Sequence, residues 1–455
     1  MKNGKRSSFS GKLGYVLAAA GASVGLGNIW RFPYLAAKYG GGIFLIIYIV
    51  LALTFGYTMI VAETAIGRMT RKSPVGAFKS FGKKKWLSFG GWINAVIPVL
   101  IVPYYSVIGG WVIKYLVEYF RGNAKLLAED GYFTDFISNG ASTELCFVAF
   151  CAFTLIIIFA GVQNGIERVS KIMMPILIVL SVIIAVYSVT RPGALAGVKY
   201  FLVPNVKNFS WMTVVSAMGQ MFYSLSIAMG ILITFGSYMK KDTAIEDSTR
   251  NVEIFDTGIA IMAGLMIIPA VFAFSGGDPD TLQAGPSLMF ITIPKVFQNM
   301  GFGTVIGIVF FVLVLFAAVT SSIALTESAV STFEDELGWG RKKATVLVGV
   351  IMLALGSLSS LGYGPLAGIK IIGMQFLDLF DFLTNSVMMP IAALITSLLV
   401  SRVVGIDKIE EEIIHGESAF RRKKVFVVMI KYLCPVFAII ILLSSVANAL
   451  GWIKM

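Results

Sequence analysis

Hydrophobic positions along this chain gather in long runs separated by short polar segments. A bilayer core takes about 20 apolar residues per helix, and eleven segments reach or approach that length. The predicted helices are 13–37, 43–66, 90–118, 146–162, 172–190, 211–238, 254–275, 302–328, 344–362, 374–401 and 425–449. Strand-like alternation is absent, so the pattern predicts an all-α polytopic membrane protein with 11 transmembrane helices rather than a membrane barrel.

Two of these helices carry glycines and polar residues where a membrane helix is normally apolar. "GASVGLGNIW" (21–30) lies in the first helix and "GQMFYSLSIAMG" (219–230) in the sixth. Close helix packing through the GxxxG motif of the first segment is one interpretation. It leaves Asn28 and Arg31 unexplained, because polar groups at membrane depth are costly and usually functional. We therefore predict that both helices unwind locally and that the freed backbone groups bind ligands.

The two interrupted helices are five helices apart in order, so two five-helix units would cross the membrane with opposite orientation. Paired interrupted helices are typical of secondary transporters with inverted repeats, which bind substrate and ions between the breaks. We predict an N-terminal tail and first repeat at 1–190, a second, inverted repeat at 211–402 and one additional transmembrane helix at 425–449.

Charge predicts how the chain is oriented. Only 14% of the 455 residues are charged and 57% are hydrophobic, whereas soluble proteins have about 25% charged residues. Seven basic residues and no acid lie between Arg68 and Lys85, whereas the loop 121–144 is acidic. The positive-inside rule therefore predicts a cytoplasmic N-terminus and, with eleven spans, an external C-terminus in the plasma (inner) membrane. The net charge of +12 then reflects topology and lipid contact rather than nucleic-acid binding.

Further polar groups are predicted at membrane depth. Thr320 and Ser321 lie in an apolar helix, where hydroxyl oxygens suit a hard cation but also fit hydrogen bonds between helices. Five acids favour ion handling, namely Glu63, Asp256, Glu327, Asp378 and Asp381. The single His415 cannot build a metal site alone, and the three cysteines indicate no disulfide framework.

Several motifs together resemble one family. They are "GLGNIWRFPY" (25–34), "GGG" (40–42), "GVQNGIERVSKIMMP" (161–175), "GQMFYSLS" (219–226) and "TSSIA" (320–324). In this order, from about residue 9 to 449, the chain resembles the neurotransmitter:sodium symporters. The resemblance implies a LeuT-type fold and sodium-coupled transport rather than enzymatic catalysis. The family's usual twelfth helix is absent, so the chain resembles the shorter bacterial members.

The resemblance also implies binding residues for two sodium ions. The first site would use the Ser23 carbonyl with Asn28, Ser224, Asp256 and the substrate carboxylate. The second site would use the carbonyls of Gly21, Val24 and Ala317 with the hydroxyls of Thr320 and Ser321.

Substrate positions carry over in the same way. The substrate carboxylate would meet the Leu26 and Gly27 amides and the Tyr105 hydroxyl, and the amine would meet carbonyls around Ser23, Tyr223 and Ser224. The side-chain pocket would be lined by Ile101, Tyr223, Ser226, Met229 and Leu325, none of which is charged. Gly25 stands where monoamine carriers of the family have Asp. These positions favour a neutral and hydrophobic amino acid.

Asp256 affects whether transport is expected to require chloride. It stands where the family's first sodium site usually has Asn, and Ala260 stands where chloride-independent members can have an acid. Tyr48, Gln220 and Ser224 match chloride-site positions, and Glu63 matches a residue that supports the unwound backbone. We expect the Asp256 carboxylate to replace chloride, so that chloride is not required.

The resemblance also implies two pairs of oppositely charged residues that act as gates. Arg31 with Asp381 would close the outer side, and Arg6 with Asp335 the inner side, with Phe9 in place of the usual Trp. Alternation between the pairs would import substrate by alternating access, although each pair also fits a static salt bridge.

Three alternatives remain open at this point. A proton-coupled carrier on the same fold would use Asp256 and Glu327 as titrating groups. A channel is disfavoured by the paired gates and broken helices. An intramembrane protease is disfavoured because HExxH is missing and because Asp378 and Asp381 lie on one helix. The oligomeric state stays open.

Overall fold

The computed structural model describes residues 7–276, 285–449 and 452. Within these residues the chain is helical and contains only two isolated β-bridges, which confirms the all-α class. The α-helices are α1 (Lys12–Ser23), α2 (Phe32–Lys38), α3 (Gly42–Leu51), α4 (Tyr57–Thr70), α5 (Pro74–Lys79), α6 (Lys85–Phe120), α7 (Ala124–Leu127), α8 (Tyr132–Ser138), α9 (Gly140–Phe159), α10 (Arg168–Val189), α11 (Ala194–Leu202), α12 (Trp211–Ser224), α13 (Ile231–Tyr238), α14 (Ile245–Ser275), α15 (Ile293–Gln298), α16 (Gly303–Leu337), α17 (Arg341–Leu361), α18 (Phe376–Asp381), α19 (Met389–Leu398), α20 (Ile406–Ile414), α21 (Lys423–Val428) and α22 (Cys434–Ala449).

Short π-helical turns join or extend several of these helices. They are η1 (Gly27–Arg31), η2 (Ala52–Gly56), η3 (Val162–Glu167), η6 (Leu288–Thr292), η7 (Phe382–Met388), η8 (Leu399–Val404) and η9 (Met429–Leu433), and η4 (Val206–Asn208) is a 3-10 turn. A π turn accommodates one extra residue and often marks a functional site.

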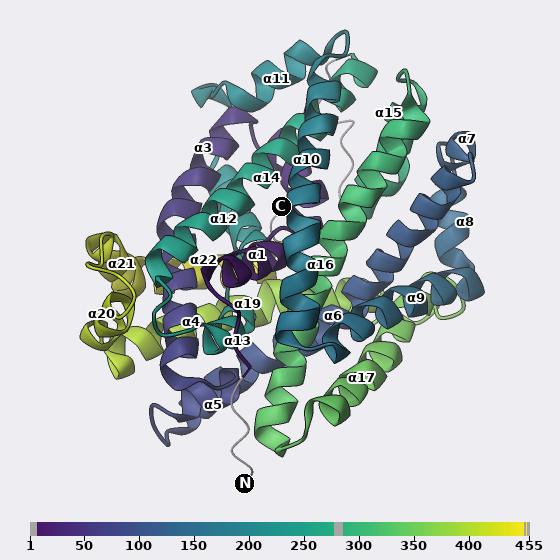
Figure 1. Ribbon diagram of the computed structural model, residues 1–455. Coiled ribbons are helices and arrows are strands. Elements are labelled where there is room, and N and C mark those ends of the chain that lie inside the picture. The colour runs from purple at the N-terminus through teal and green to yellow at the C-terminus, as the bar shows by residue number, and fades with distance from the viewer. Residues whose placement is uncertain (1–6, 277–284, 450–451, 453–455) are drawn as a thin grey trace.

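The helices pack as one bundle around α1 (Figure 1). α1 contacts α10, α14 and α16, and α6 packs along α16. α9 and α17 lie side by side at the lower right of the view, and α20 and α21 lie beside α4 at the left. The first interrupted helix is therefore enclosed by other helices rather than exposed to lipid.

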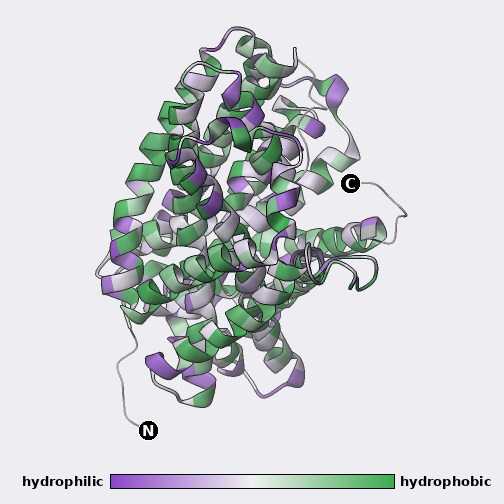
Figure 2. Ribbon diagram, turned by 90° about the vertical axis from the view of Figure 1, so that its right-hand side faces the viewer, coloured by the Kyte–Doolittle hydropathy of each residue, from purple (hydrophilic) through white to green (hydrophobic). Residues whose placement is uncertain are grey.

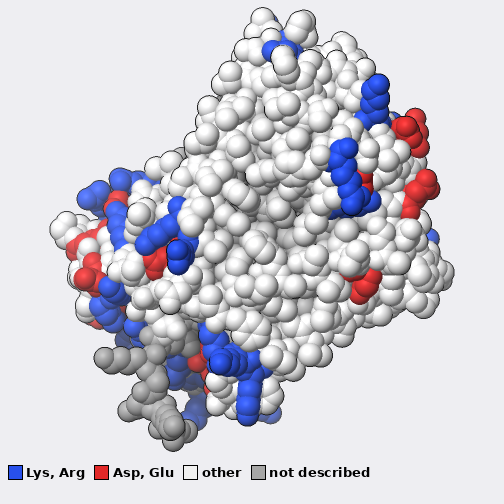
Figure 3. Space-filling view, turned by 45° about the vertical axis from the view of Figure 1, so that its right-hand side comes forward, with Lys and Arg blue, Asp and Glu red and all other residues white. Residues whose placement is uncertain are grey.

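The outer surface fits a bilayer. Apolar residues predominate along the helices in Figure 2, and the charged side chains of Figure 3 gather towards the edges of a broad uncharged face. Among the described residues, nine helices are long and apolar enough to span a membrane, or ten if the bent pair Lys12–Ser23 and Gly27–Lys38 is one span. The predicted number of eleven is not confirmed, because the predicted helix 211–238 consists of α12 and α13, each too short to be counted.

Helix ends differ from the predicted ones at several places. The predicted helix 146–162 ends at Phe159, and the next begins at Val162 instead of 172. Between them Gly161 has a φ of 90° and a ψ of −174°, a non-helical conformation that glycine adopts readily and that separates the two helices. α14 and α16 extend by several residues beyond their apolar runs, because a helix continues into water whereas hydropathy marks only its buried length.

Candidate functional site

The first break separates α1 from η1. The backbone is extended at Val24 (φ −75°, ψ 92°), and the helix resumes at Gly27 with a bend of 53°. The Asn28 side-chain oxygen accepts the Gly25 N–H at 3.2 Å, which replaces a helical hydrogen bond. A Cβ on Gly27 would lie 2.3 Å from the Tyr223 ring, so glycine is needed for this close approach.

The second break separates α12 from α13 and uses left-handed backbone. Ser226, Ala228 and Gly230 have φ values of 52°, 58° and 70°. This region is sparsely populated by residues other than glycine and stores strain. The Ala228 N–H donates to a carboxylate oxygen of the fully buried Glu63 at 2.7 Å. Glu63 thereby satisfies a backbone donor that the helix no longer pairs.

The two breaks are joined to each other. The Ser226 hydroxyl donates to the Ala22 carbonyl at 2.9 Å, and the Gln220 amide donates to the Gly27 carbonyl at 3.0 Å. The Ser23 hydroxyl lies 3.3 Å from the Leu225 carbonyl. Three hydrogen bonds between side chains and backbone carbonyls thus link the two interrupted helices at their breaks.

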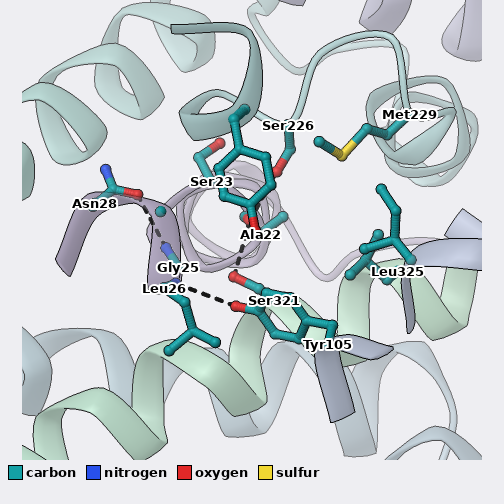
Figure 4. Close-up of a pocket in the computed structure, with 13 residues that line it drawn as sticks. Ala22, Ser23, Gly25, Leu26, Asn28, Tyr105, Ser226, Met229, Ser321 and Leu325 are labelled. Carbon is teal, nitrogen blue, oxygen red and sulfur yellow. Dashed lines mark hydrogen bonds between the residues drawn. The ribbon is translucent and has the colours of Figure 1, made fainter. Parts of the chain in front are cut away.

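A cavity of about 350 Å³ lies between the breaks (Figure 4). Its lining holds no charged side chain: Ala22, Ser23, Gly25, Leu26, Gly27, Asn28, Ile101, Tyr105, Tyr223, Ser226, Met229, Ser321 and Leu325. The Leu26 N–H donates to the Tyr105 hydroxyl at 3.3 Å. Of the ten predicted substrate residues, only Ser224 lies outside this lining. The largely apolar, uncharged lining suits a small ligand with an uncharged side chain.

Asp256 on α14 is the centre of a buried polar cluster beside the cavity. Its carboxylate accepts from the Asn28 amide at 2.8 Å, from the Tyr48 hydroxyl at 2.9 Å and from the Ser224 hydroxyl at 2.9 Å. All four residues are at most 1% exposed. These partners come from η1, α3 and α12, so the cluster ties three parts of the bundle to α14. Ala260, about one turn further along α14, brings no polar group.

A second cluster has no carboxylate. The Ser321 hydroxyl on α16 lies 3.2 Å from the Gly21 carbonyl and 3.4 Å from the Val24 carbonyl, both at the end of α1. The Thr320 hydroxyl lies 3.2 Å from the Ala317 carbonyl. Carbonyl and hydroxyl oxygens are ligands for a hard cation. Across the described residues, no group of three or more His, Cys, Asp or Glu could hold a metal ion.

The predicted outer charge pair does not form a direct contact. The Arg31 guanidinium lies 5.3 Å from the centre of the Tyr223 ring, while Asp381 accepts from Tyr104 at 3.1 Å and from Asn385 at 2.6 Å. Arg31 and Asp381 line the same two cavities beside Tyr223, with no ion pair between these two described side chains. Nothing in the sequence pattern identified Tyr104 or Asn385 as partners of Asp381.

Only Asp335 of the predicted inner pair lies among the described residues. Arg6 lies outside the described residues. Asp335 accepts the Ser73 N–H at 2.6 Å. The buried Phe9 packs against Tyr238 and donates its N–H to the Tyr238 carbonyl at 3.0 Å.

Two further acids have local partners. Glu327 is fully buried and binds Arg341 at 2.6 Å and the Tyr238 hydroxyl at 2.7 Å. The Tyr363 hydroxyl lies 3.5 Å from Asp378. Glu327 is therefore neutralised within the structure, and neither acid belongs to the cavity between the breaks.

Two interrupted helices around an uncharged cavity, with two oxygen clusters beside it, are the arrangement of a secondary transporter. The sequence model of the sodium:neurotransmitter symporter family matches residues 6–127 and 132–451. The chain therefore belongs to this family, whose members are secondary transporters and not enzymes.

Individual relatives agree with this assignment. The chain is 34% identical to the sodium-dependent transporter YhdH of Bacillus subtilis, over 98% of this chain and 99% of the relative. It is 26% identical to the human sodium- and chloride-dependent GABA transporter 2, over 90% of this chain and 75% of that protein. The crystal structure of MhsT in complex with L-phenylalanine is similar with a TM-score of 0.86 and 35% identity, covering 97% of this chain and 100% of MhsT. This likeness supports the LeuT-type fold.

Proposed function

We propose that this protein is a sodium-coupled symporter that imports a neutral, hydrophobic amino acid by alternating access. The observation that carries the proposal is the cavity between the breaks, which residues of both interrupted helices line without any charged side chain. Leu26, Gly27 and Tyr105 would bind the carboxylate, and Ser23, Tyr223 and Ser224 would lie near the amine. Ile101, Ser226, Met229 and Leu325 would surround the side chain. The L-phenylalanine bound to MhsT supports this substrate class.

Two sodium ions would bind at the two oxygen clusters. The first ion would use Ser23, Asn28, Ser224, Asp256 and the substrate carboxylate, and the second would use Gly21, Val24, Ala317, Thr320 and Ser321. Both clusters contact the first break, through Asn28 and through the Gly21 and Val24 carbonyls, so each ion would stabilise the backbone where the helix is broken.

Asp256 would remove the need for chloride. A buried carboxylate beside a cation supplies the negative charge that a bound anion would otherwise provide. Its direct bonds to Tyr48 and Ser224, two of the residues at chloride-site positions, support this role. Gln220 would act on the backbone instead, through the Gly27 carbonyl.

In alternating access, the cavity would open in turn to the outer and to the inner side of the membrane. Arg31 and Asp381 would approach each other over Tyr223 when the outer side closes, and Arg6 with Asp335 would close the inner side. We further propose eleven spans in an inverted five-plus-five arrangement with α22 added, counting α1 with α2 and α12 with α13 as one span each. The N-terminus would be cytoplasmic and the C-terminus external in the plasma membrane.

Uptake into proteoliposomes tests the function. Radiolabelled phenylalanine, leucine and methionine would be offered under an inward sodium gradient, with a matched potassium gradient at the same pH as control. Accumulation above the equilibrium level in sodium alone is the expected result. Equal uptake in both gradients, combined with accumulation driven by an inward proton gradient, would replace sodium coupling by proton coupling. Passive equilibration without accumulation would instead indicate a channel.

A further inference from the structure

Two tyrosines of one membrane helix bind two carboxylates of α14 at different depths. The helix Gly42–Thr70 consists of α3, η2 and α4. The Tyr48 hydroxyl donates to Asp256 at 2.9 Å, and the Tyr57 hydroxyl donates to Glu246 at 2.9 Å. Only the first contact belongs to the cluster beside the cavity.

The π turn η2 makes these two contacts compatible. Tyr48 and Tyr57 are nine residues apart, which would place them about 180° apart around an uninterrupted α-helix. The π turn between them accommodates one extra residue, so the angle falls to about 80°. Glu246 and Asp256 are ten residues apart on α14, which also gives an offset of about 80°. The two tyrosines can therefore both point towards α14, and the two carboxylates of α14 can both point towards the tyrosines.

The contact at Tyr57 is anchored by a second segment of the chain. Glu246 accepts the backbone N–H groups of Arg421 and Arg422 at 2.8 and 2.9 Å. The Arg422 guanidinium lies 4.6 Å from the Tyr57 ring centre and donates to Glu253 at 3.2 Å. Tyr57, Glu246 and Glu253 are at most 5% exposed. We call Tyr57, Glu246, Glu253 and Arg422 the Tyr57 clamp.

We propose that the Tyr57 clamp positions α14 so that Asp256 stays in reach of Tyr48 and thereby sets sodium affinity. Glu246 lies about 15 Å along α14 from Asp256 at 1.5 Å per residue, so the clamp does not touch the ion. It acts because both contacts lie between the same two helices. A shift or rotation at the clamp displaces Asp256 relative to Tyr48. This inference rests on the proposed function, in which Asp256 binds sodium.

Tyr57→Phe tests the clamp, because it removes one hydroxyl and keeps the ring under Arg422. The measurement is the sodium concentration that gives half-maximal substrate uptake in proteoliposomes. We expect it to rise about three- to tenfold, the range that loss of one hydrogen bond commonly produces, with the maximal rate at saturating sodium retained. Tyr115→Phe is the matched control: that buried hydroxyl donates to the Phe290 carbonyl at 2.7 Å, away from α14.

A double-mutant cycle separates positioning from general stability. Tyr48→Phe and Tyr57→Phe would each raise the half-maximal sodium concentration, and the double variant would raise it by less than the product of the two, because Tyr57 acts through the Tyr48–Asp256 contact. Melting temperatures without sodium show whether each variant is folded; should Tyr57→Phe fail to fold, Arg422→Lys replaces it.

The outcomes distinguish the two proposals. Unchanged sodium dependence in Tyr57→Phe, an equal change in Tyr115→Phe, or effects that multiply in the double variant would overturn the clamp while sodium coupling stands. Sodium-independent uptake by the unaltered protein would overturn sodium coupling and the clamp with it.

Discussion

The two oxygen clusters beside the cavity differ in where their negative charge comes from. The cluster around Asp256 holds a full carboxylate charge, and side chains from three other segments already bind it. The cluster around Ser321 holds only hydroxyls and carbonyls, which belong to the C-terminal end of α1 and to Ala317 on α16.

The difference shows two ways to prepare a cation site in a membrane. A carboxylate supplies strong attraction but costs free energy when buried without a partner, which explains its three hydrogen bonds. The carbonyls of Gly21 and Val24 are left without helical partners by the break itself, and the C-terminal end of a helix carries a partial negative charge. We therefore expect the first cluster to depend on charge balance and the second on local geometry.

Asp256→Asn is expected to have the largest effect. Loss of a unit charge about 4 Å from a cation costs about 4 kcal/mol at an effective dielectric constant of about 20. Sodium-driven uptake without chloride should therefore fall on the order of 1,000-fold, and added chloride should restore part of it. Uptake is measured in chloride and in gluconate media.

Asp130→Asn, the same change at a 93% exposed side chain, is the control. Chloride stimulation of the unaltered protein that persists unchanged in Asp256→Asn would contradict the assignment of the charge to Asp256.

Ser321→Ala is expected to have an intermediate effect. It removes a neutral hydroxyl beside the Gly21 and Val24 carbonyls, so the half-maximal sodium concentration should rise about tenfold, or about 1.4 kcal/mol, equally with and without chloride. Ser322→Ala is the matched control, since its buried hydroxyl lies 3.2 Å from Thr154 instead. If the two variants change sodium dependence alike, the second cluster is not a cation site.

Tyr105→Phe is expected to have the smallest effect and to leave both clusters intact. The Tyr105 hydroxyl contacts the Leu26 N–H at 3.3 Å, on the side of the cavity proposed for the carboxylate. The KM for amino acid should rise about threefold to tenfold, as for one hydrogen bond. The half-maximal sodium concentration at saturating amino acid should not change. A changed sodium dependence with an unaltered KM would instead place Tyr105 at a cation site.

Local sequence determined much of the architecture. Long apolar runs predicted the helical membrane bundle because each helix satisfies its own backbone within the bilayer. The breaks lie inside the segments 21–30 and 219–230, where glycines and polar residues weaken the helix. The residues expected around the substrate come mostly from these two segments, which explains why most of them line one cavity.

Contacts between distant helices depended on the tertiary structure. The resemblance implied that Asp256 belongs to the first cluster, but its bonds to Asn28, Tyr48 and Ser224 follow from how α14 is rotated. Tyr104 and Asn385 as partners of Asp381, and the Tyr57 clamp, had no signal in the hydrophobic pattern. One residue turns a helix by about 100°, so a single π turn changes which side chains meet. The sequence by itself therefore determined where the helices run and where they break, and only their packing decided which polar groups face each other.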